Sequence, residues 1–213
     1  MAKPRKPYHK PNLEAVLIET ATALVAERGR EGLSLRDLGK AAGVSRSAAY
    51  HYFADKNALL AKVGASGFAA LGARIAAARP RDTSLESAAV AGLGAYVKFA
   101  HANPHLFRLM FANVLRRDLV SRDVGGPDGS FAFSSESAMQ AFGGFVRAVE
   151  GAQAVGLLRA GDPLLIVNTL WAFAHGVAEL SLGDNFKSAH SVDAILETGI
   201  PAILRHFSPP SRS

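Results

Sequence analysis

The chain has 213 residues, 49% of them apolar, which is enough to bury a sizeable hydrophobic core. It contains no cysteine, so disulfide bonds, thiolate metal sites and cysteine nucleophiles are excluded. Of the formal net charge of +6, residues 1–56 carry +4 (10 Lys and Arg against 6 Asp and Glu) and residues 57–213 carry +2 (14 against 12). This distribution is typical of a polyanion-binding head on a nearly neutral body, and a solvated basic tail is the alternative.

The start of the chain is basic and rich in proline, and it lacks the apolar core of a signal peptide. No stretch reaches the roughly 20 uninterrupted apolar residues of a membrane span. We therefore expect a soluble, cytoplasmic protein with no membrane partner. The basic residues of this N-terminal arm either reach DNA phosphates or an adjacent minor groove, or only keep the chain soluble. They are Lys3, Arg5, Lys6, His9 and Lys10.

Apolar residues three and four apart recur through almost the whole chain, and alternating β-branched runs are few. This pattern predicts an all-α protein of about nine helices. The first helix is expected to begin at an N-cap on Asn12 and to end at Gly29. The second is expected to be capped by Ser34 and to end near Gly43, and the third, which is short, to be capped by Ser45.

A long fourth helix, capped by Asp55, is expected from Lys56 to about residue 79. Its interior glycines each cost about 0.5–1 kcal/mol relative to alanine, so they indicate either close packing of a neighbouring helix or a bend that differs between two functional forms. These glycines are Gly64, Gly67 and Gly72. Later helices are expected at about residues 84–102, 104–118, 132–157, 163–182 and 191–206, with a loop at 121–130. Residues 1–56 would form one domain and residues 57–213 a second, larger one.

The second and third helices form a helix-turn-helix pattern, in which Gly43 permits the sharp turn and Val44 can fill the space between the helices. In such a unit the second helix of the pair enters the major groove of DNA. Helical spacing turns Ala49 and Phe53 toward the core. The same spacing places four side chains on the outer face, namely Arg46, Ser47, Tyr50 and His51.

Residues 17–60 resemble the N-terminal DNA-binding domain of the TetR family of bacterial transcriptional regulators. The motif elements present are Gly29, Leu35, Leu38, Ala42, Gly43, Val44, Ser45, Tyr50, Phe53, Lys56 and Leu59. The chain departs from the family pattern at Gly39, Ala49 and Asn57, which affects the fine tuning of the head and not its role.

The resemblance implies that Tyr50 and Lys56 hold DNA phosphates. It also implies that the residues nearest the base edges are Arg46, Ser47, Ala48 and His51. The position of Lys56 agrees with this, because a positive charge in the first turn of a helix opposes the helix dipole and is better explained by an external anion. A half-buried structural tyrosine at Tyr50 and a surface histidine without a partner at His51 are the alternatives.

Trp171, His175 and Gly176 form a W-x-x-x-H-G motif that resembles a subgroup of the family, and residues 103–111 are similar to a stretch found there too. Because Trp171 and His175 lie one turn apart on one helix face, both can line one cavity. The bulky residues expected to complete a pocket for a small apolar or aromatic effector are Phe107, Met110, Phe111, Phe142 and Phe145. The alternative is a filled core in which His175 is hydrogen bonded.

The last two helices carry apolar stripes that suit self-association. The first stripe is Leu164, Val167, Leu170, Ala174, Val177 and Ala178, and the second is Val192, Ile195, Leu196, Ile200 and Leu204. In the resembled family such helices form a dimeric four-helix bundle, and Ala172 and Gly176 would permit close helix contact. The resemblance thus implies a homodimeric repressor, without a cofactor, that binds a palindromic operator and is released by an effector.

Two other functions were weighed against this one. The chain has no GxSxG, HExxH, Walker phosphate loop or GxGxxG after a strand, which argues against an enzyme. A metal-responsive regulator would use His101 and His105, four residues apart, with a third ligand such as His175. Pro104 lies between the first two histidines and makes a common helix face for them doubtful.

Overall fold

The computed structural model describes residues 12–78, 80, 84–114, 136–183 and 190–210. All regular secondary structure in these residues is α-helical, so the all-α prediction of about nine helices is confirmed. The helices are α1 (Leu13–Arg28), α2 (Leu35–Ala41), α3 (Arg46–Tyr52), α4 (Lys56–Ala78), α5 (Leu85–Ala102), α6 (Pro104–Val114), α7 (Glu136–Ala154), α8 (Pro163–Leu182) and α9 (Val192–His206). The N-terminal arm, the expected loop at 121–130 and the expected helix ends near 118 and 132 lie outside the described residues.

The helix starts follow the predicted capping, with one exception. The side chains of Ser34, Ser45 and Asp55 each accept a hydrogen bond from the backbone amide three residues on, at 3.1, 3.2 and 2.8 Å. The prediction that the Asn12 side chain caps α1 is wrong. Asn12 has a φ of 78° and makes no capping bond, and only its carbonyl accepts, from the Val16 amide at 3.2 Å. Asparagine tolerates this left-handed conformation better than most residues.

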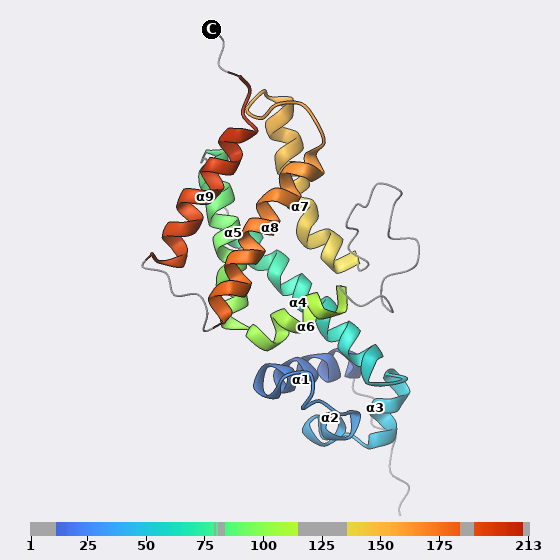
Figure 1. Cartoon of the computed structure of the whole chain (residues 1–213). Coiled ribbons are helices and arrows are strands. Elements are labelled where there is room, and N and C mark those ends of the chain that lie inside the picture. The colour runs from blue at the N-terminus through green and yellow to red at the C-terminus, as the bar shows by residue number, and fades with distance from the viewer. Residues whose placement is uncertain (1–11, 79, 81–83, 115–135, 184–189, 211–213) are drawn as a thin grey trace, which may run out of the picture.

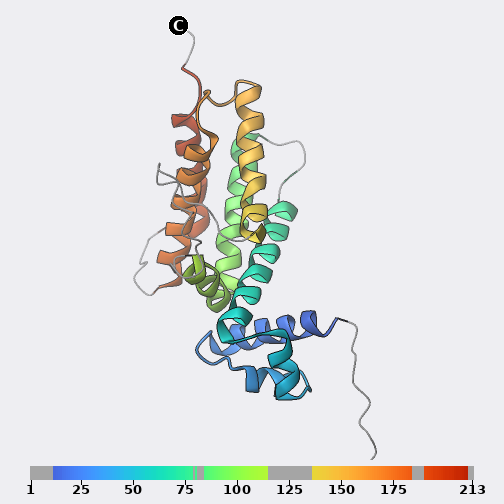
Figure 2. The same cartoon turned by 90° about the vertical axis from the view of Figure 1, so that its right-hand side faces the viewer.

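Helices α1, α2 and α3 form a small head at one end of the molecule (Figures 1 and 2). Gly43 has a φ of 66°, which glycine adopts readily, and this allows the sharp turn between α2 and α3. Val44 packs against the core beside this turn. The helix-turn-helix geometry expected from the sequence is therefore present.

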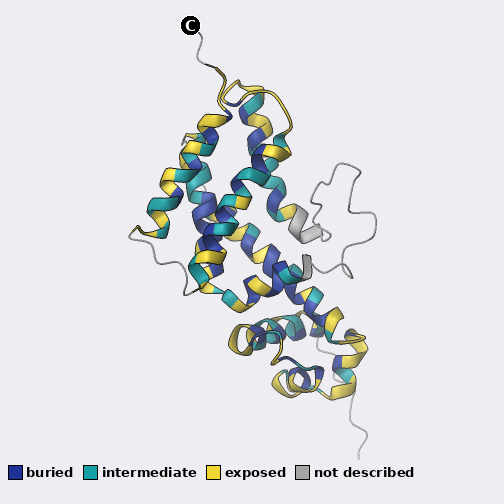
Figure 3. Cartoon of the chain, viewed as in Figure 1, coloured by how far each residue is buried: buried dark blue, intermediate teal, exposed yellow. Residues whose placement is uncertain are grey.

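The helices from α4 onward form the body, and α4 links it to the head (Figure 2). Helix α4 begins at Lys56, the last residue of the first domain expected from the sequence, and it contacts α1 as well as α5, α6 and α7. Helix α5 lies centrally and contacts α4, α6, α8 and α9. The short helix α6 contacts both α1 and α4, at the junction between head and body (Figure 1). Buried apolar side chains form one continuous cluster through head and body (Figure 3).

Two of the three α4 glycines lie at close helix contacts. A methyl group at Gly67 would lie 2.7 Å from Met110 Sδ and 3.2 Å from Leu106 Cδ1, so α6 crosses α4 at this point. A methyl group at Gly72 would lie 3.2 Å from the Cα atom of Ala141 on α7. The packing explanation of the α4 glycines is therefore supported at both positions.

Helices α4 and α8 are long and apolar enough to cross a membrane, judged by length and composition alone. In the structure α4 packs between α5, α6 and α7, and α8 packs against α5, α7 and α9. Core helices of globular proteins have the same composition, so packing in the bundle accounts for both helices.

Candidate nucleic-acid interface and effector site

The outer face of α3 carries the predicted base-reading residues. Arg46, Ser47, Tyr50 and His51 are exposed, and Ala48 is half-buried. On the opposite face Ala49 and Phe53 are buried, as the helical spacing predicts. The head presents this face at the end of the molecule that is remote from α9 (Figure 1). A short helix with small residues beside its exposed side chains can approach the floor of a major groove closely.

Contacts within α3 and with its N-cap involve all four of the exposed side chains. Arg46 Nη2 lies 3.5 Å from Tyr50 Oη, and the guanidinium carbon lies 5.3 Å from the centre of the Tyr50 ring, which is a cation–π distance. Ser47 Oγ lies 2.9 Å from the capping hydroxyl of Ser45. The ring of Tyr52, which is 38% exposed, meets His51 edge to face at 5.5 Å. Tyr52 was not predicted as part of the outer face, because helical spacing places it between the buried and the outer face of α3. It is nevertheless exposed, because α3 ends at this residue.

Lys56 is half-buried at the first turn of α4, and its Nζ donates a hydrogen bond of 3.4 Å to the backbone carbonyl of Glu31. This bond reaches across to the turn between α1 and α2. An ammonium group has three donors, and one long bond to a neutral carbonyl does not compensate its charge. The arrangement leaves Lys56 able to donate to an anion at the same edge of the head as α3.

Tyr96 joins α5 to the W-x-x-x-H motif of α8 inside the body. Its buried hydroxyl lies 2.7 Å from His175 Nδ1 and accepts a bond of 3.3 Å from Trp171 Nε1–H. If His175 Nδ1 carried a proton, the hydroxyl proton of Tyr96 would be buried without an acceptor. Tyr96 therefore donates its hydrogen bond to an unprotonated His175 Nδ1. Burial raises the pKa of Tyr96 well above its usual value. Burial also lowers the pKa of His175, which the Glu179 carboxylate opposes, so His175 is neutral near pH 7.

Aromatic rings from two other helices surround these groups. Phe107 and Phe111 of α6 lie 5.5 and 4.7 Å from the His175 ring, and Phe142 of α7 lies 5.6 Å from Trp171. We call this group, with Tyr96, the aromatic cluster; its members are Tyr96, Phe107, Phe111, Phe142, Trp171 and His175. It is the filled arrangement weighed as the alternative to a pocket. Sequence reasoning missed Tyr96 because it lies in a run of α5 where nearly every residue is buried.

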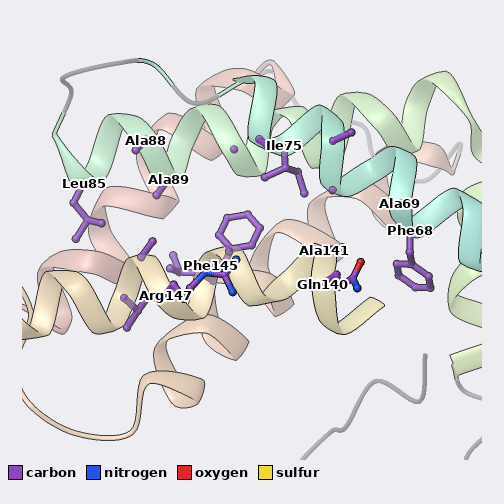
Figure 4. A pocket seen from close by; sticks show the side chains of 18 of the residues that line it. Phe68, Ala69, Ile75, Leu85, Ala88, Ala89, Gln140, Ala141, Phe145 and Arg147 are labelled. Atoms are coloured by element: carbon purple, nitrogen blue, oxygen red, sulfur yellow. The ribbon is translucent and has the colours of Figure 1, made fainter. Parts of the chain in front are cut away.

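A cavity of about 420 Å³ lies on the other side of Phe145, between α4, α5 and α7 (Figure 4). Phe145 lines it, and it is the one residue of the predicted pocket that does so; Met110 instead packs on Gly67. The walls are mostly small residues at helical spacing, and this pattern in the sequence could have indicated the cavity. These are Ala69, Gly72, Ala73 and Ala76 of α4, Ala88, Ala89 and Gly92 of α5, and Ala141, Gly144 and Ala148 of α7.

The two histidines of the metal hypothesis lie on different helices and contact different elements. His101 Nε2 lies 2.7 Å from Ser181 Oγ on α8. His105 lies at the start of α6 against Gly29, where a methyl group would be 3.4 Å from His105 Nδ1. Among the residues the structure describes, no group of three or more His, Cys, Asp or Glu could hold a metal ion. The metal hypothesis therefore gains no support from the geometry.

The face of α8 that was expected to mediate self-association is mostly turned inward. Most of its predicted stripe is buried in the protomer's own core, because α8 packs against α5, α7 and α9; these residues are Val167, Leu170, Ala174, Val177 and Ala178. The same holds for Leu196, Ile200 and Leu204 of α9. A different set of residues faces outward, which we call the α8 outer stripe: Leu165, Thr169, Ala172, Gly176 and Leu180. Leu165 and Leu180 are 57% and 55% exposed, and the space beside Gly176 is open.

Comparison with known proteins agrees with this architecture. A family model described as bacterial regulatory proteins of the tetR family matches residues 17–63, and one described as the tetracyclin repressor-like C-terminal domain matches residues 89–203. No curated protein matches the chain.

Solved structures share the fold over nearly the full length. A protein of unknown function from Rhodococcus sp. RHA1 is 30% identical, with a TM-score of 0.76, over 96% of this chain and 100% of that chain. A bacterial regulatory protein in the tetR family from Rhodococcus RHA1 is 18% identical, with a TM-score of 0.62, over 93% and 98%. A TetR family transcription regulator from Marinobacter aquaeolei VT8 is 16% identical, with a TM-score of 0.65, over 88% and 93%. The chain belongs to the TetR family of bacterial regulatory proteins, and it is a DNA-binding transcription regulator and not an enzyme.

Proposed function

We propose that the protein is a homodimeric repressor that binds a two-fold-symmetric operator through two α3 helices and dissociates when a small organic effector binds its body. The observation that carries this proposal is the exposed outer face of α3, with Arg46, Ser47, Tyr50 and His51 presented together at the free end of the head. A helix of seven residues contacts too few base pairs for useful specificity. Two heads related by a two-fold axis double the contacts and match a palindromic site.

The α8 outer stripe, together with the neighbouring face of α9, supplies the proposed dimer interface. Small residues at its centre, Ala172 and Gly176, let a second helix approach closely, and leucines flank them at both ends. An exposed apolar stripe of this kind on a single protomer indicates a partner surface. A second copy with the same stripe covers it symmetrically.

The path from effector to DNA runs through α4 and α6 in this proposal. Helix α4 begins at Lys56 in the head and lines the cavity from Phe68 to Ala76. Helix α6 contacts α1 in the head and contributes Phe107 and Phe111 to the aromatic cluster. An effector that favours a different packing of these helices changes the spacing of the two heads, and only its differential affinity for the two forms can drive the change.

Footprinting on the DNA around the protein's own gene tests the proposal, combined with light scattering to determine the oligomeric state. We expect a protected, roughly palindromic site bound by one dimer. A monomer that protects a specific site would contradict the proposal.

A further inference from the structure

We propose that the cavity between α4, α5 and α7 binds an elongated organic monoanion, an apolar body that ends in one carboxylate, and that Arg147 pairs with that carboxylate. This inference rests on the proposed function, in which the body binds an effector, and it names the chemistry of that effector. The apolar lining selects the body of the ligand, and the one charged residue selects its head group.

Among the described residues that line the cavity, Arg147 carries the one charged side chain and Gln140 is the one neutral polar residue; the others are apolar residues and glycines. It is exposed on α7, and no described residue forms an ion pair or hydrogen bond with its guanidinium group. Even Glu150, one turn further along α7, is not paired with it. A guanidinium group offers two parallel donors that match the two oxygens of a carboxylate. The cavity thus has an apolar interior and an unused cation at its edge.

The shape of the cavity favours a slender ligand. Gln140 and Arg147 are seven residues apart on α7, which corresponds to about 10 Å along the helix. Figure 4 shows Gln140 and Phe68 toward one end of the cavity, Leu85 toward the other, and Arg147 between them beside Phe145. Small residues from all three helices form the walls between these ends. A volume of about 420 Å³ lies within the range of small-molecule sites and accommodates a medium-chain carboxylate.

The cavity adjoins the aromatic cluster through one ring. Phe145, which lines the cavity, lies 6.5 Å from Phe142, and Phe142 lies 5.6 Å from Trp171. Trp171 is the only tryptophan in the sequence. A ligand that displaces the Phe145 ring therefore changes the surroundings of the sole indole, and the intrinsic fluorescence of the protein reports that change.

The experiment measures binding of decanoate and of its neutral counterpart decan-1-ol to the full-length protein without DNA, by calorimetry and Trp171 fluorescence. The Arg147→Gln variant removes the cation, and Arg74→Gln is its control, because Arg74 is exposed on α4 but does not line the cavity. The Gly144→Leu variant fills the cavity, since Gly144 lines it and a Cβ atom at Gly144 meets no atom within 4 Å. Gly151→Leu is its control, because Gly151 is equally open on α7 but outside the lining.

We expect decanoate to bind wild type and Arg74→Gln equally, and Arg147→Gln about tenfold more weakly, which is the scale of one charge-assisted hydrogen bond. Decan-1-ol should bind wild type and Arg147→Gln alike, and Gly144→Leu should bind neither probe while Gly151→Leu binds both. Thermal melts of each variant check that it is folded. Leucine in place of glycine favours a helix, so both leucine variants should be at least as stable as wild type.

Equal affinity of wild type and Arg147→Gln for decanoate, or undiminished binding by Gly144→Leu, overturns the inference. Failure of every straight-chain carboxylate from octanoate to tetradecanoate to bind overturns it as well. These outcomes are distinct from failure of the proposed function. If the protein protects an operator but binds no carboxylate, the proposed regulatory function stands and the inference about the cavity is wrong. If decanoate binds but leaves operator affinity unchanged, the cavity is a carboxylate site but not the effector site.

Discussion

The hydroxyl group of Tyr96 explains why Trp171 and His175 stand one turn apart. Trp171 can only donate a hydrogen bond and a neutral His175 can accept one at Nδ1, and a hydroxyl group does both at once. The three residues tie α5 to α8 in the centre of the body. Because both hydrogen bonds are partly buried among aromatic rings, loss of either bond is expected to cost more than it would at the surface.

The Tyr96→Phe variant tests this tie at nearly constant volume. It removes both hydrogen bonds and leaves His175 Nδ1 without its donor, so we expect a loss of about 1–3 kcal/mol in the free energy of unfolding. Urea denaturation of the variant and wild type measures the difference. Tyr52→Phe, at an exposed tyrosine of α3, is the control and should change the unfolding free energy by less than about 0.5 kcal/mol. An equally small effect at Tyr96 would show that the bonds contribute no net stability.

The lowered pKa of His175 predicts how stability depends on pH. Between that lowered value and the usual value of 6.5, the unfolded chain binds more protons at this residue than the folded protein does. The free energy of unfolding should therefore fall as the pH is lowered through 6.5. The His175→Gln variant lacks this contribution to the pH dependence of its unfolding free energy. The difference in unfolding free energy between wild type and the variant should therefore shrink as the pH is lowered. Urea titrations at several pH values on both sides of 6.5 measure it, and parallel pH profiles would contradict the prediction.

In the proposed function, the head separates residues that position DNA from residues that read its sequence. Lys56→Ala should weaken binding to all DNA sequences and reduce the slope of log affinity against log salt by about one, because one phosphate contact is lost. Tyr50→Phe should also weaken binding to all sequences. Arg46→Ala should instead change which sequences are preferred. Lys98→Ala, on the exposed side of α5, is the control. Titrations of specific and random duplexes at several salt concentrations decide the point, and an unchanged salt slope in Lys56→Ala refutes the assignment.

At the scale of single helices, glycines with different surroundings predict opposite effects of the same substitution. Gly67→Ala brings a methyl group to 2.7 Å from Met110 Sδ, so the buried Met110 side chain, or α6 with it, must shift. Overpacking costs about 1–3 kcal/mol, and the higher helix propensity of alanine returns less than about 1 kcal/mol. We expect a net loss of stability in Gly67→Ala. A gain of up to about 1 kcal/mol is expected in Gly144→Ala, where the space is open. Thermal melts compare the two, and the Gly67→Ala penalty should shrink in a Met110→Ala background.

The helices were predictable from sequence to within a few residues because capping and periodicity are local properties. Ser34, Ser45 and Asp55 cap their helices through bonds that span three residues, so the sequence already contains both partners. Which face of α8 is buried is not a local property. Periodicity identifies apolar faces, but α8 has two, and only its packing against α5, α7 and α9 decides which one remains outside.

The candidate sites divide in the same way. The outer face of α3 followed from helical spacing once Ala49 and Phe53 had been assigned to the core. Of the residues predicted to line an effector pocket, five pack together in the aromatic cluster, and Phe145 lines the cavity instead. Which of them fill space depends on side chains from several helices, and the cavity lies where α4, α5 and α7 carry alanine and glycine.

At the scale of the whole molecule, DNA binding should depend on the α8 outer stripe although it lies far from α3. Gly176→Arg places a long charged side chain at the centre of the stripe, and a second copy cannot bury it without a partner charge. We expect this variant to be folded and monomeric by light scattering, with operator affinity reduced at least about a hundredfold, because two half-sites no longer act together. Ala70→Arg, at an exposed position of α4, should remain dimeric and bind normally. A Gly176→Arg dimer would show that another surface mediates assembly.

The junction at α6 has a consequence for engineering. His105 lies against Gly29, whose φ of 69° strongly favours glycine, and the next residue, Leu106, lies with Met110 against Gly67. We therefore expect a chimaera that keeps this body and takes residues 12–55 from a relative to bind the relative's operator and to respond to the effector of this body. The condition is that glycine is retained at position 29. Grafts that bring a bulkier residue to that position would lift the new head off α6. They should then bind DNA without responding to the ligand.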